Sequence, residues 1–248
     1  MTATRLLRAE VRKLTTTRLP LWFLATTMLL ALAVAAAVLL GAGTDDAAGM
    51  FGTLASQRSL LSFGTNAMMV AGMFGAIAVA SEYAHGTVIS RYLVTPDRHR
   101  ALVAQRLALL LAGGVIGLVG GALAVAAGFV AFPLVGLERL VDASVAVRLT
   151  ATATFAGAIG AVFGAGVGAV VRNTGGAVAA IVAFLLIGPP IVAQLSATAA
   201  PWVPAALVAT LVGGVDEVSI ATAVAALLLW GIVPAFVGSA AVIRRDVV

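Results

Sequence analysis

The sequence predicts an all-α integral membrane protein with six transmembrane helices. Apolar residues make up 62% of the 248 positions and charged residues only 10%, whereas charged residues form roughly a quarter of a soluble domain. Six apolar stretches have a length of about 20 residues, which a helix needs to cross a bilayer. Most basic residues lie on one side of these stretches when both termini are placed in the cytoplasm. We therefore expect a single transmembrane domain over 1–248.

Residues 1–18 predict an amphipathic helix that lies in the cytoplasmic interface of the membrane. Leu7, Val11 and Leu14 recur at the helical period and form an apolar side. Arginines lie on the opposite side, where they can meet anionic lipid headgroups. An ordinary basic flank that only sets topology is the alternative. The charged residues of this segment are Arg5, Arg8, Glu10, Arg12 and Lys13.

The six spans are expected at residues 19–43, 60–80, 107–133, 149–171, 175–195 and 219–243. The first apolar run exceeds the usual length of a signal-peptide core, so we interpret it as an uncleaved span. With both termini inside, only Arg58, Arg139 and Arg148 of the 15 basic residues fall outside. The positive-inside rule then places the long loop at 81–106 in the cytoplasm. The bases beside the spans set topology and meet lipid, so we expect no nucleic-acid partner.

Two spans carry glycine at every fourth position, which places each set on one helix face. Without side chains, such faces let two helix backbones approach closely. We expect a tight contact either between spans three and four or between subunits, although a chain with 27 glycines also produces such spacing by chance. The two sets are Gly113, Gly117 and Gly121, and Gly160, Gly164 and Gly168.

The fifth span contains Gly188-Pro189-Pro190, and two successive prolines remove two helix hydrogen bonds. We therefore expect this span to kink or break before the outer face. The apolar segment at 201–214 is too short to cross the membrane. It is interpreted either as a re-entrant or interfacial element on the outer side or as a plain hydrophobic loop.

The loop at 81–106 holds both histidines of the chain and several arginines. Thr95-Pro96 is typical of a helix start, with threonine as the N-cap and proline in the first turn. This helix should continue through Gln105 and Arg106 into span three. Gly86 interrupts the chain upstream, so residues 85–94 predict a separate short helix under the membrane.

These residues resemble a known family. The pattern Glu-x-x-x-Gly-Thr at 82–87, followed by Thr-Pro-x-Arg at 95–98, is similar to that of the permease subunits of type-2 (ABC-2) ABC exporters. Residues 10–14 and 16–18 also resemble the start of such permeases. The order of six spans, an interfacial N-terminal helix and a long inner loop agrees with the family over the whole chain.

The resemblance implies that residues 85–94 are the coupling helix, which sits in a groove of a separate cytosolic ATPase subunit. It also implies a second permease copy or a paralogous permease, with ATP and magnesium bound by the ATPase. Glu82 is expected to pair with a base of the N-terminal helix or of the ATPase, or to be a hydrated interfacial acid. The residues expected to serve coupling are Glu82, His85, Gly86, Thr87, Arg91, Thr95, Pro96 and Arg98.

Energy must come from another chain, since a P-loop requires Gly-x-x-x-x-Gly-Lys-Ser/Thr and the only lysine follows no glycine. No span has an ionisable residue in its middle, which argues against an ion-coupled transporter. No catalytic motif or metal site is found, and we expect no enzyme activity in this chain. An uncoupled channel or an immunity or scaffold protein is the alternative.

The transported molecule is expected to be amphipathic: lipid-like, drug-like or a peptide. Neutral polar groups interrupt the apolar spans, and they are expected either to line a substrate path or to join helices. Thr65, Asn66 and Gln194 are the main candidates for such a path, with Ser62, Thr152 and Thr154 beside them.

Overall fold

The computed structural model describes residues 3–42, 50–86, 98–214 and 217–244, and every regular element in these ranges is a helix. Six helical paths are long and apolar enough to cross a membrane. They run over Leu19–Gly41, Leu54–Ala84, His99–Leu134, Ala143–Val171, Thr174–Leu195 and Ile220–Val242. All six overlap the expected spans, so the prediction of an all-helical protein with six helices able to span a membrane is confirmed.

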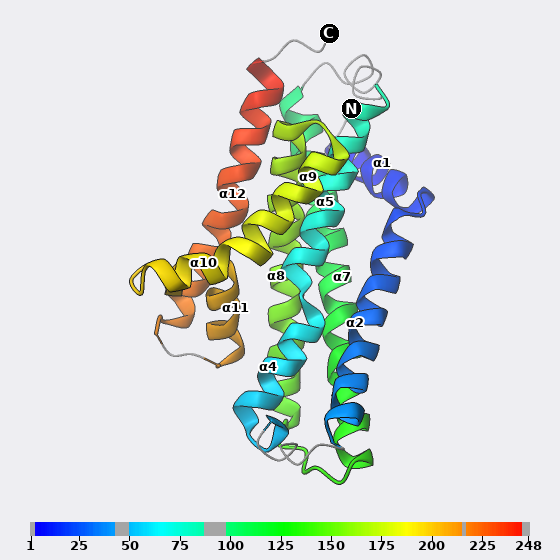
Figure 1. The fold of residues 1–248 in the computed structure, drawn as a ribbon. Helices are drawn as coiled ribbons and strands as arrows, with labels where there is room; N and C mark the ends of the chain where they lie inside the picture. The colour runs from blue at the N-terminus through cyan, green and yellow to red at the C-terminus, as the bar shows by residue number, and fades with distance from the viewer. Residues whose placement is uncertain (1–2, 43–49, 87–97, 215–216, 245–248) are drawn as a thin grey trace.

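The chain begins with a helix outside the bundle and continues through long rods joined by shorter pieces (Figure 1). The N-terminal half contains α1 (Ala3–Thr16), α2 (Leu19–Gly41), α4 (Leu54–Thr65), α5 (Ala67–Ala84) and α7 (Arg98–Leu134). The C-terminal half contains α8 (Ala143–Val171), α9 (Thr174–Val182), the π-helix η1 (Ala183–Ile187), α10 (Gly188–Leu195), the 3₁₀ turn η2 (Ala200–Trp202), α11 (Pro204–Val212) and α12 (Ile220–Arg244).

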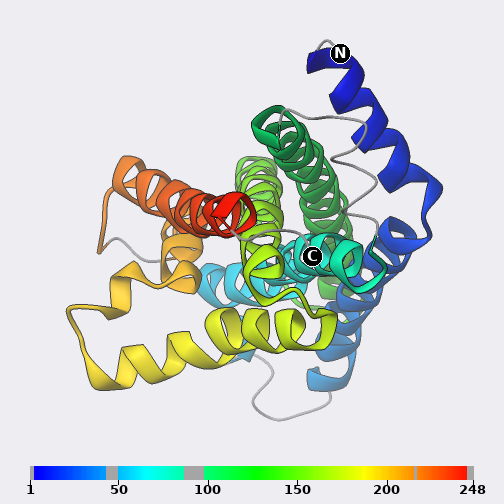
Figure 2. The ribbon, with the colours of Figure 1, turned by 90° about the horizontal axis from the view of Figure 1, so that it is seen from above.

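Helix α1 and the last turns of α12 lie at one end of the bundle, which we call the terminal end (Figure 1). The opposite end, where α2 ends and α8 begins, is called the far end. Helix α7 is continuous from Arg98 past Arg106 into the third span, as expected. Seen from above, α1 lies across the outside of the bundle (Figure 2).

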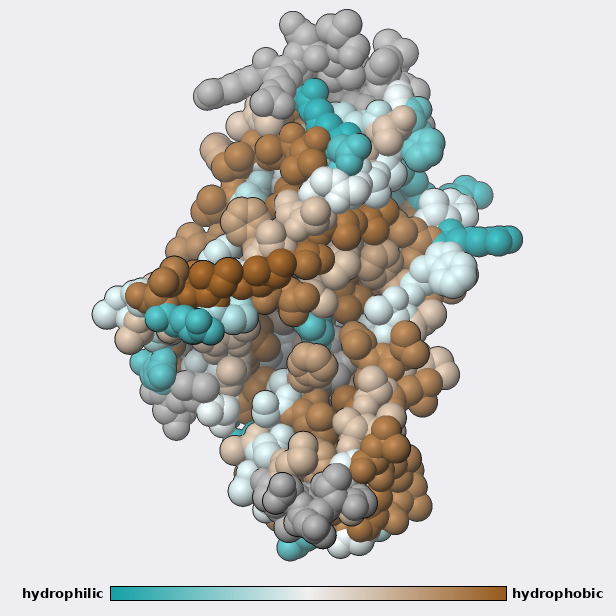
Figure 3. Space-filling view, in the orientation of Figure 1, coloured by the Kyte–Doolittle hydropathy of each residue, from teal (hydrophilic) through white to brown (hydrophobic). Residues whose placement is uncertain are grey.

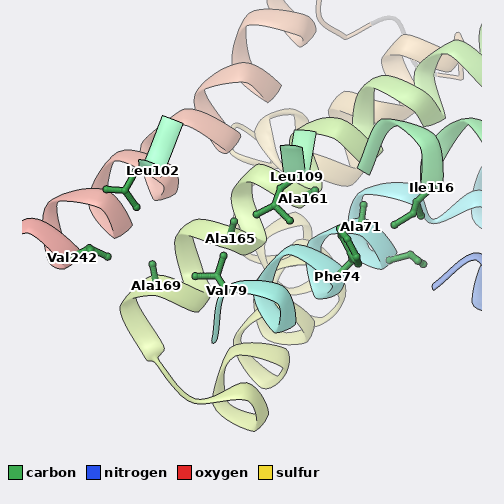
Figure 4. Close-up of a cluster of buried hydrophobic side chains, with 11 residues drawn as sticks. Ala71, Phe74, Val79, Leu102, Leu109, Ile116, Ala161, Ala165, Ala169 and Val242 are labelled. Atoms are coloured by element: carbon green, nitrogen blue, oxygen red, sulfur yellow. The ribbon is translucent and has the colours of Figure 1, made fainter. Parts of the chain in front are cut away.

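Helix α8 is the central rod, because α5, α7 and α12 all pack against it. Within the most apolar 18-residue stretch of this span, 67% is buried inside the protein, whereas the corresponding share is 17% for the sixth span. Figure 4 shows one of the apolar clusters that these helices share, with Phe74 of α5, Leu109 of α7 and Val242 of α12 turned toward the alanines of α8. The peripheral helices expose apolar side chains instead, as lipid-facing helices do.

The two glycine sets do not face each other. Gly113, Gly117 and Gly121 of α7 meet α8 as expected; a Cβ on Gly117 would lie 2.1 Å from the carbonyl oxygen of Ala153. Gly160, Gly164 and Gly168 of α8, however, face α5. The expected tight contact between spans three and four is present, but the glycine set of α8 does not take part in it, because that set lies on the face of α8 that meets α5.

The α5 contact is the closest of these approaches. A Cβ on Gly164 would lie 1.8 Å from the carbonyl oxygen of Gly72, and a Cβ on Gly160 would lie 2.2 Å from that of Met68. A third face of α8 meets α12, where a Cβ on Gly166 would lie 2.3 Å from the backbone of Pro234. Glycine thus lets three helices approach α8 at backbone distance.

The fifth span is not broken at its two prolines. Its helical path widens at η1, where the Gly188 N–H donates to the carbonyl of Ala183, and it continues as α10. A π turn of this kind accommodates residues that cannot supply the ordinary hydrogen bonds. The path bends here and leaves the bundle obliquely (Figures 1 and 2). The kink was correctly predicted, and a complete break was not needed.

Candidate functional site

A buried acidic residue lies at the end of the second span, on the terminal end of the bundle. Glu82 lies in the last turn of α5, and its side chain is only 8% exposed. It forms an ion pair with Lys13 of α1, and the Gln105 side chain of α7 donates to Glu82 Oε1 at 3.0 Å. We call these three residues the Lys13–Glu82 cluster. Of the alternatives for Glu82, pairing with the N-terminal helix is confirmed and a hydrated acid is wrong.

The residues that follow Glu82 end helix α5. Gly86 adopts a left-handed φ of +66°, which side-chain-bearing residues rarely adopt. His85 Nδ1 donates to the carbonyl of Ser81 at 2.7 Å, and the backbone N–H of His85 donates to the same carbonyl. The expected interruption at Gly86 is therefore confirmed, and Glu82 is held one turn before the loop.

Helix α1 has three faces rather than two. Arg5, Arg8 and Arg12 are exposed, as expected for residues that meet headgroups. Of the expected apolar side, Leu14 packs against the apolar core while Val11 is 37% exposed, and Leu6, which was not expected there, is buried. Glu10 and Lys13 lie on the side of α1 that meets the bundle, with Lys13 Nζ 3.6 Å from Glu10 Oε2. The third face, with Val11, is free to meet lipid.

A cavity of about 320 Å³ lies beside the cluster, between α1, α5 and α7. Its polar wall includes Glu10, Lys13, Glu82 and Gln105, and its apolar wall includes Leu109. Helix α1 packs on α7, and the ion pair of Lys13 with Glu82 adds a direct polar contact with α5.

Five of the eight residues expected to serve coupling cannot be placed in full. Thr87, Arg91, Thr95 and Pro96 lie outside the described residues, and so does most of the short helix expected at 85–94. Arg98 is described only as the first residue of α7. Glu82, His85 and Gly86 lie together at the end of α5, where the loop begins.

The second candidate site is a groove on the side of the bundle. It has a volume of about 620 Å³ and is walled by α4, the start of α5, α8, the η1–α10 segment and α11. Figure 3 shows the hollow beneath the ridge that α10 forms. Phe63 and Leu186 line it while being 67% and 47% exposed, so its mouth opens on an apolar flank. We call this site the lateral groove.

Irregular backbone surrounds the lateral groove. The second span breaks at Asn66, which has left-handed angles of φ 30° and ψ 38° and separates α4 from α5. The π turn η1 precedes Pro189 and Pro190 on another wall. The segment expected as either a re-entrant element or a loop contains the helix α11, and so it is not a plain loop. In membrane proteins, broken helices occur where they are buried or line a cavity.

Some of the neutral polar residues of the spans line the lateral groove, and others lie elsewhere. Asn66, Ser62 and Thr152 line the groove, as a substrate path would require. Thr154 instead donates to the carbonyl of Thr150 within α8. Gln194 is exposed on α10 and does not line the described part of the groove. The side chain of Thr65 lies outside the described residues.

Three further residues of these sites were missed by sequence reasoning. Gln105 is 4% exposed and its side chain donates a hydrogen bond to Glu82; an amide beside the start of the third apolar span was the available signal. Arg58 and Arg148 were counted only as exceptions to the charge asymmetry, yet both donate to carbonyls at the end of α11. An arginine on the less basic side of a membrane protein was the available signal.

The chain was compared with protein-family models and with curated proteins. No protein-family model matches the chain, and no curated protein matches it in sequence. The Lys13–Glu82 cluster and the lateral groove, carried by a six-span helical bundle, are therefore the features from which a function is inferred.

Proposed function

We propose that the protein is the permease subunit of an ABC transporter and exports an amphipathic molecule with energy from a separate ATPase. The observation that carries this proposal is the position of the Lys13–Glu82 cluster. The buried acid ends the second span one turn before the loop that is expected to bind the ATPase, and it is joined to the N-terminal helix. A force applied to the loop thus reaches α1 and α5 together.

The terminal end faces the cytoplasm in this proposal. The exposed arginines of α1 then meet anionic lipid of the inner leaflet. The loop at 87–97 and the start of α7 meet the ATPase, which binds ATP and magnesium. A second permease copy or a paralogue completes the transporter. In a bacterial cell, this orientation places the protein in the inner membrane.

The lateral groove supplies the route for the transported molecule. Its walls are mainly apolar, and Asn66, Ser62 and Thr152 offer neutral hydrogen-bonding groups. Sites for small molecules commonly combine an apolar lining with a few polar groups. The exposed Phe63 at the mouth lets a lipid-soluble molecule reach the groove from the bilayer. This lining suits a lipid-like, drug-like or peptide substrate better than a small ion.

Helix α5 connects the two sites, because it starts at Asn66 in the groove and ends beside Glu82. Its glycine contacts with α8 keep the two backbones in close register. A close-packed rod transmits a displacement at one end to the other. Closure of the ATPases would therefore change the groove through α5.

The test is purification of the tagged protein from its native membrane in a gentle detergent. We expect a P-loop ATPase to co-purify in stoichiometric amount, as identified by mass spectrometry, and the complex to hydrolyse ATP. Replacing residues 87–94 by a Gly/Ser segment should detach the ATPase, whereas Arg139→Ala at the far end should not. If crosslinking in intact membranes also finds no ATPase, the proposal fails in favour of an uncoupled channel or scaffold.

A further inference from the structure

Helix α11 is held at its C-terminal end by two arginines from two different helices. Arg148 of α8 donates from Nε to the carbonyl of Leu211 at 2.6 Å and from Nη2 to that of Thr210 at 3.4 Å. Arg58 of α4 donates from Nη1 to the carbonyl of Gly213 at 2.9 Å. The last carbonyls of a helix lack partners within it and carry the negative end of its dipole. We call Arg58 and Arg148 the arginine clamp.

The backbone at the end of α11 is shaped for this contact. Gly213 has a φ of +83°, and a Cβ at this position would lie 2.9 Å from Arg148 Nη1. A side chain there would both strain the left-handed backbone and push the guanidinium away. Glycine at this position therefore keeps the clamp and the helix end in contact.

The other contacts of α11 join it both to α12 and, through apolar packing, to α8. Leu207 and Leu211 pack in one apolar cluster with Leu227 of α12. Before α11 begins, Trp230 of α12 donates from Nε1 to the carbonyl of Trp202 at 3.1 Å. Apolar packing thus holds α11 to α12 and α8, and the clamp adds three hydrogen bonds that join its end to α4 and α8.

The clamp connects three walls of the lateral groove, since α4, α8 and α11 all line it. We propose that Arg58 and Arg148 are positioning residues that set the width of the lateral groove, and thereby the bulk of the molecule it admits. The inference rests on the proposed function in taking the groove as the substrate site, but the clamp is measured without any substrate. Without its bonds to the three carbonyls, the end of α11 is held to α4 and α8 by apolar packing alone, and the groove widens there.

The absence of cysteine makes a direct distance measurement possible. Ser59 of α4 and Ala205 of α11 are exposed and line the groove, so Ser59→Cys and Ala205→Cys accept nitroxide labels. Pulsed electron paramagnetic resonance in lipid nanodiscs then reports the distance between the two walls. With the native arginines we expect one narrow distance distribution.

Arg58→Gln and Arg148→Gln should each broaden this distribution and add a population at longer distance. Arg58→Lys keeps a cationic donor near the helix end and should retain the narrow distribution. The matched control is Arg139→Gln, because Arg139 lies over the ring of Phe129 at 4.5 Å and belongs to the connection between α7 and α8. It should leave the distribution unchanged.

Two results would overturn the proposal that the arginine clamp sets the width of the groove. The first is an unchanged distance distribution in both glutamine variants, and the second is the same broadening in Arg139→Gln. If Arg148→Gln does not fold, Arg58→Gln decides, because Arg58 supplies only one of the three bonds. A helical circular dichroism spectrum at the temperature of the measurement must accompany the broadening, so that unfolding is not its cause. Failure to find a partner ATPase would overturn the proposed function while leaving this distance result intact.

Discussion

Lys13 of α1 and Glu82 of α5 form an ion pair although the two residues lie 69 positions apart in the sequence. Glu82 is the more deeply buried partner, and Gln105 of a third helix shares its Oε1 atom. Three helices of the terminal end thus meet at one carboxylate. Because a buried charge is costly without partners, this carboxylate fixes how α1, α5 and α7 are arranged.

Removal of this carboxylate should loosen α1. We expect Glu82→Ala to lower the free energy of unfolding by about 1–3 kcal/mol, because two charge-assisted hydrogen bonds are lost. The thermal midpoint in detergent, followed by circular dichroism, measures the effect. The exchange Lys13→Glu with Glu82→Lys should recover part of the loss. A wild-type midpoint for Glu82→Ala would show that the pair does not support the fold.

The glycine face between α8 and α5 should tolerate no added carbon. Gly164→Ala should cost about 1–3 kcal/mol, because the new methyl group meets the backbone of Gly72. Gly164→Leu should prevent assembly of the folded protein. The matched control is Gly114→Ala, where the nearest atom is 3.8 Å away and the change should stay within about 1 kcal/mol. Yield and thermal midpoint in detergent measure both. Equal effects of the two alanine substitutions would contradict this assignment of the glycine faces.

Asn66 allows backbone conformation and ligand contact to be separated. Asn66→Val should destabilise by roughly 1–2 kcal/mol, because a β-branched residue is disfavoured in the left-handed region. Asn66→Gly accepts that conformation and should fold normally, yet it removes the amide from the groove. We therefore expect Asn66→Gly to keep its melting temperature while transport in inside-out vesicles falls. Normal transport by this variant would remove Asn66 from the substrate path.

Because Asp142 caps helix α8 at the far end, we expect the stability of the protein to fall at acidic pH. Its carboxylate caps α8 by accepting from the Val145 N–H at 2.8 Å, and this bond, followed by one from Ser144, lowers its pKa. A lowered folded-state pKa contributes stability above the ordinary aspartate pKa, and that contribution is lost as pH falls through the folded value. The thermal midpoint should therefore drop below about pH 4.

Asp142→Asn is the control for this pH dependence. Asparagine is also a good N-cap, so helix α8 should still start at the same place. Its amide does not titrate, and the part of the acid sensitivity that comes from the cap should disappear. Identical pH profiles for the two proteins would show that other groups cause the acid effect.

Much of the lateral groove could not be predicted from the sequence. The polar residues Ser62, Asn66 and Thr152 were visible as interruptions of apolar runs, but so was Thr154, which bonds within its own helix. Which of them meet depends on the break at Asn66 and on the bend at η1. Both rotate the helices that follow them, and a linear pattern does not contain that rotation.

The sequence by itself determined the class of this protein, the six spans and the exposed arginines of α1. Hydropathy and charge act locally, since each stretch must satisfy its own backbone in lipid and each base resists burial. Only the tertiary structure decided which glycine set meets which helix, that Glu82 pairs with Lys13, and that Arg58 and Arg148 hold α11. These are choices of partner, and they depend on how the helices turn about their axes when α5, α7 and α12 pack around α8.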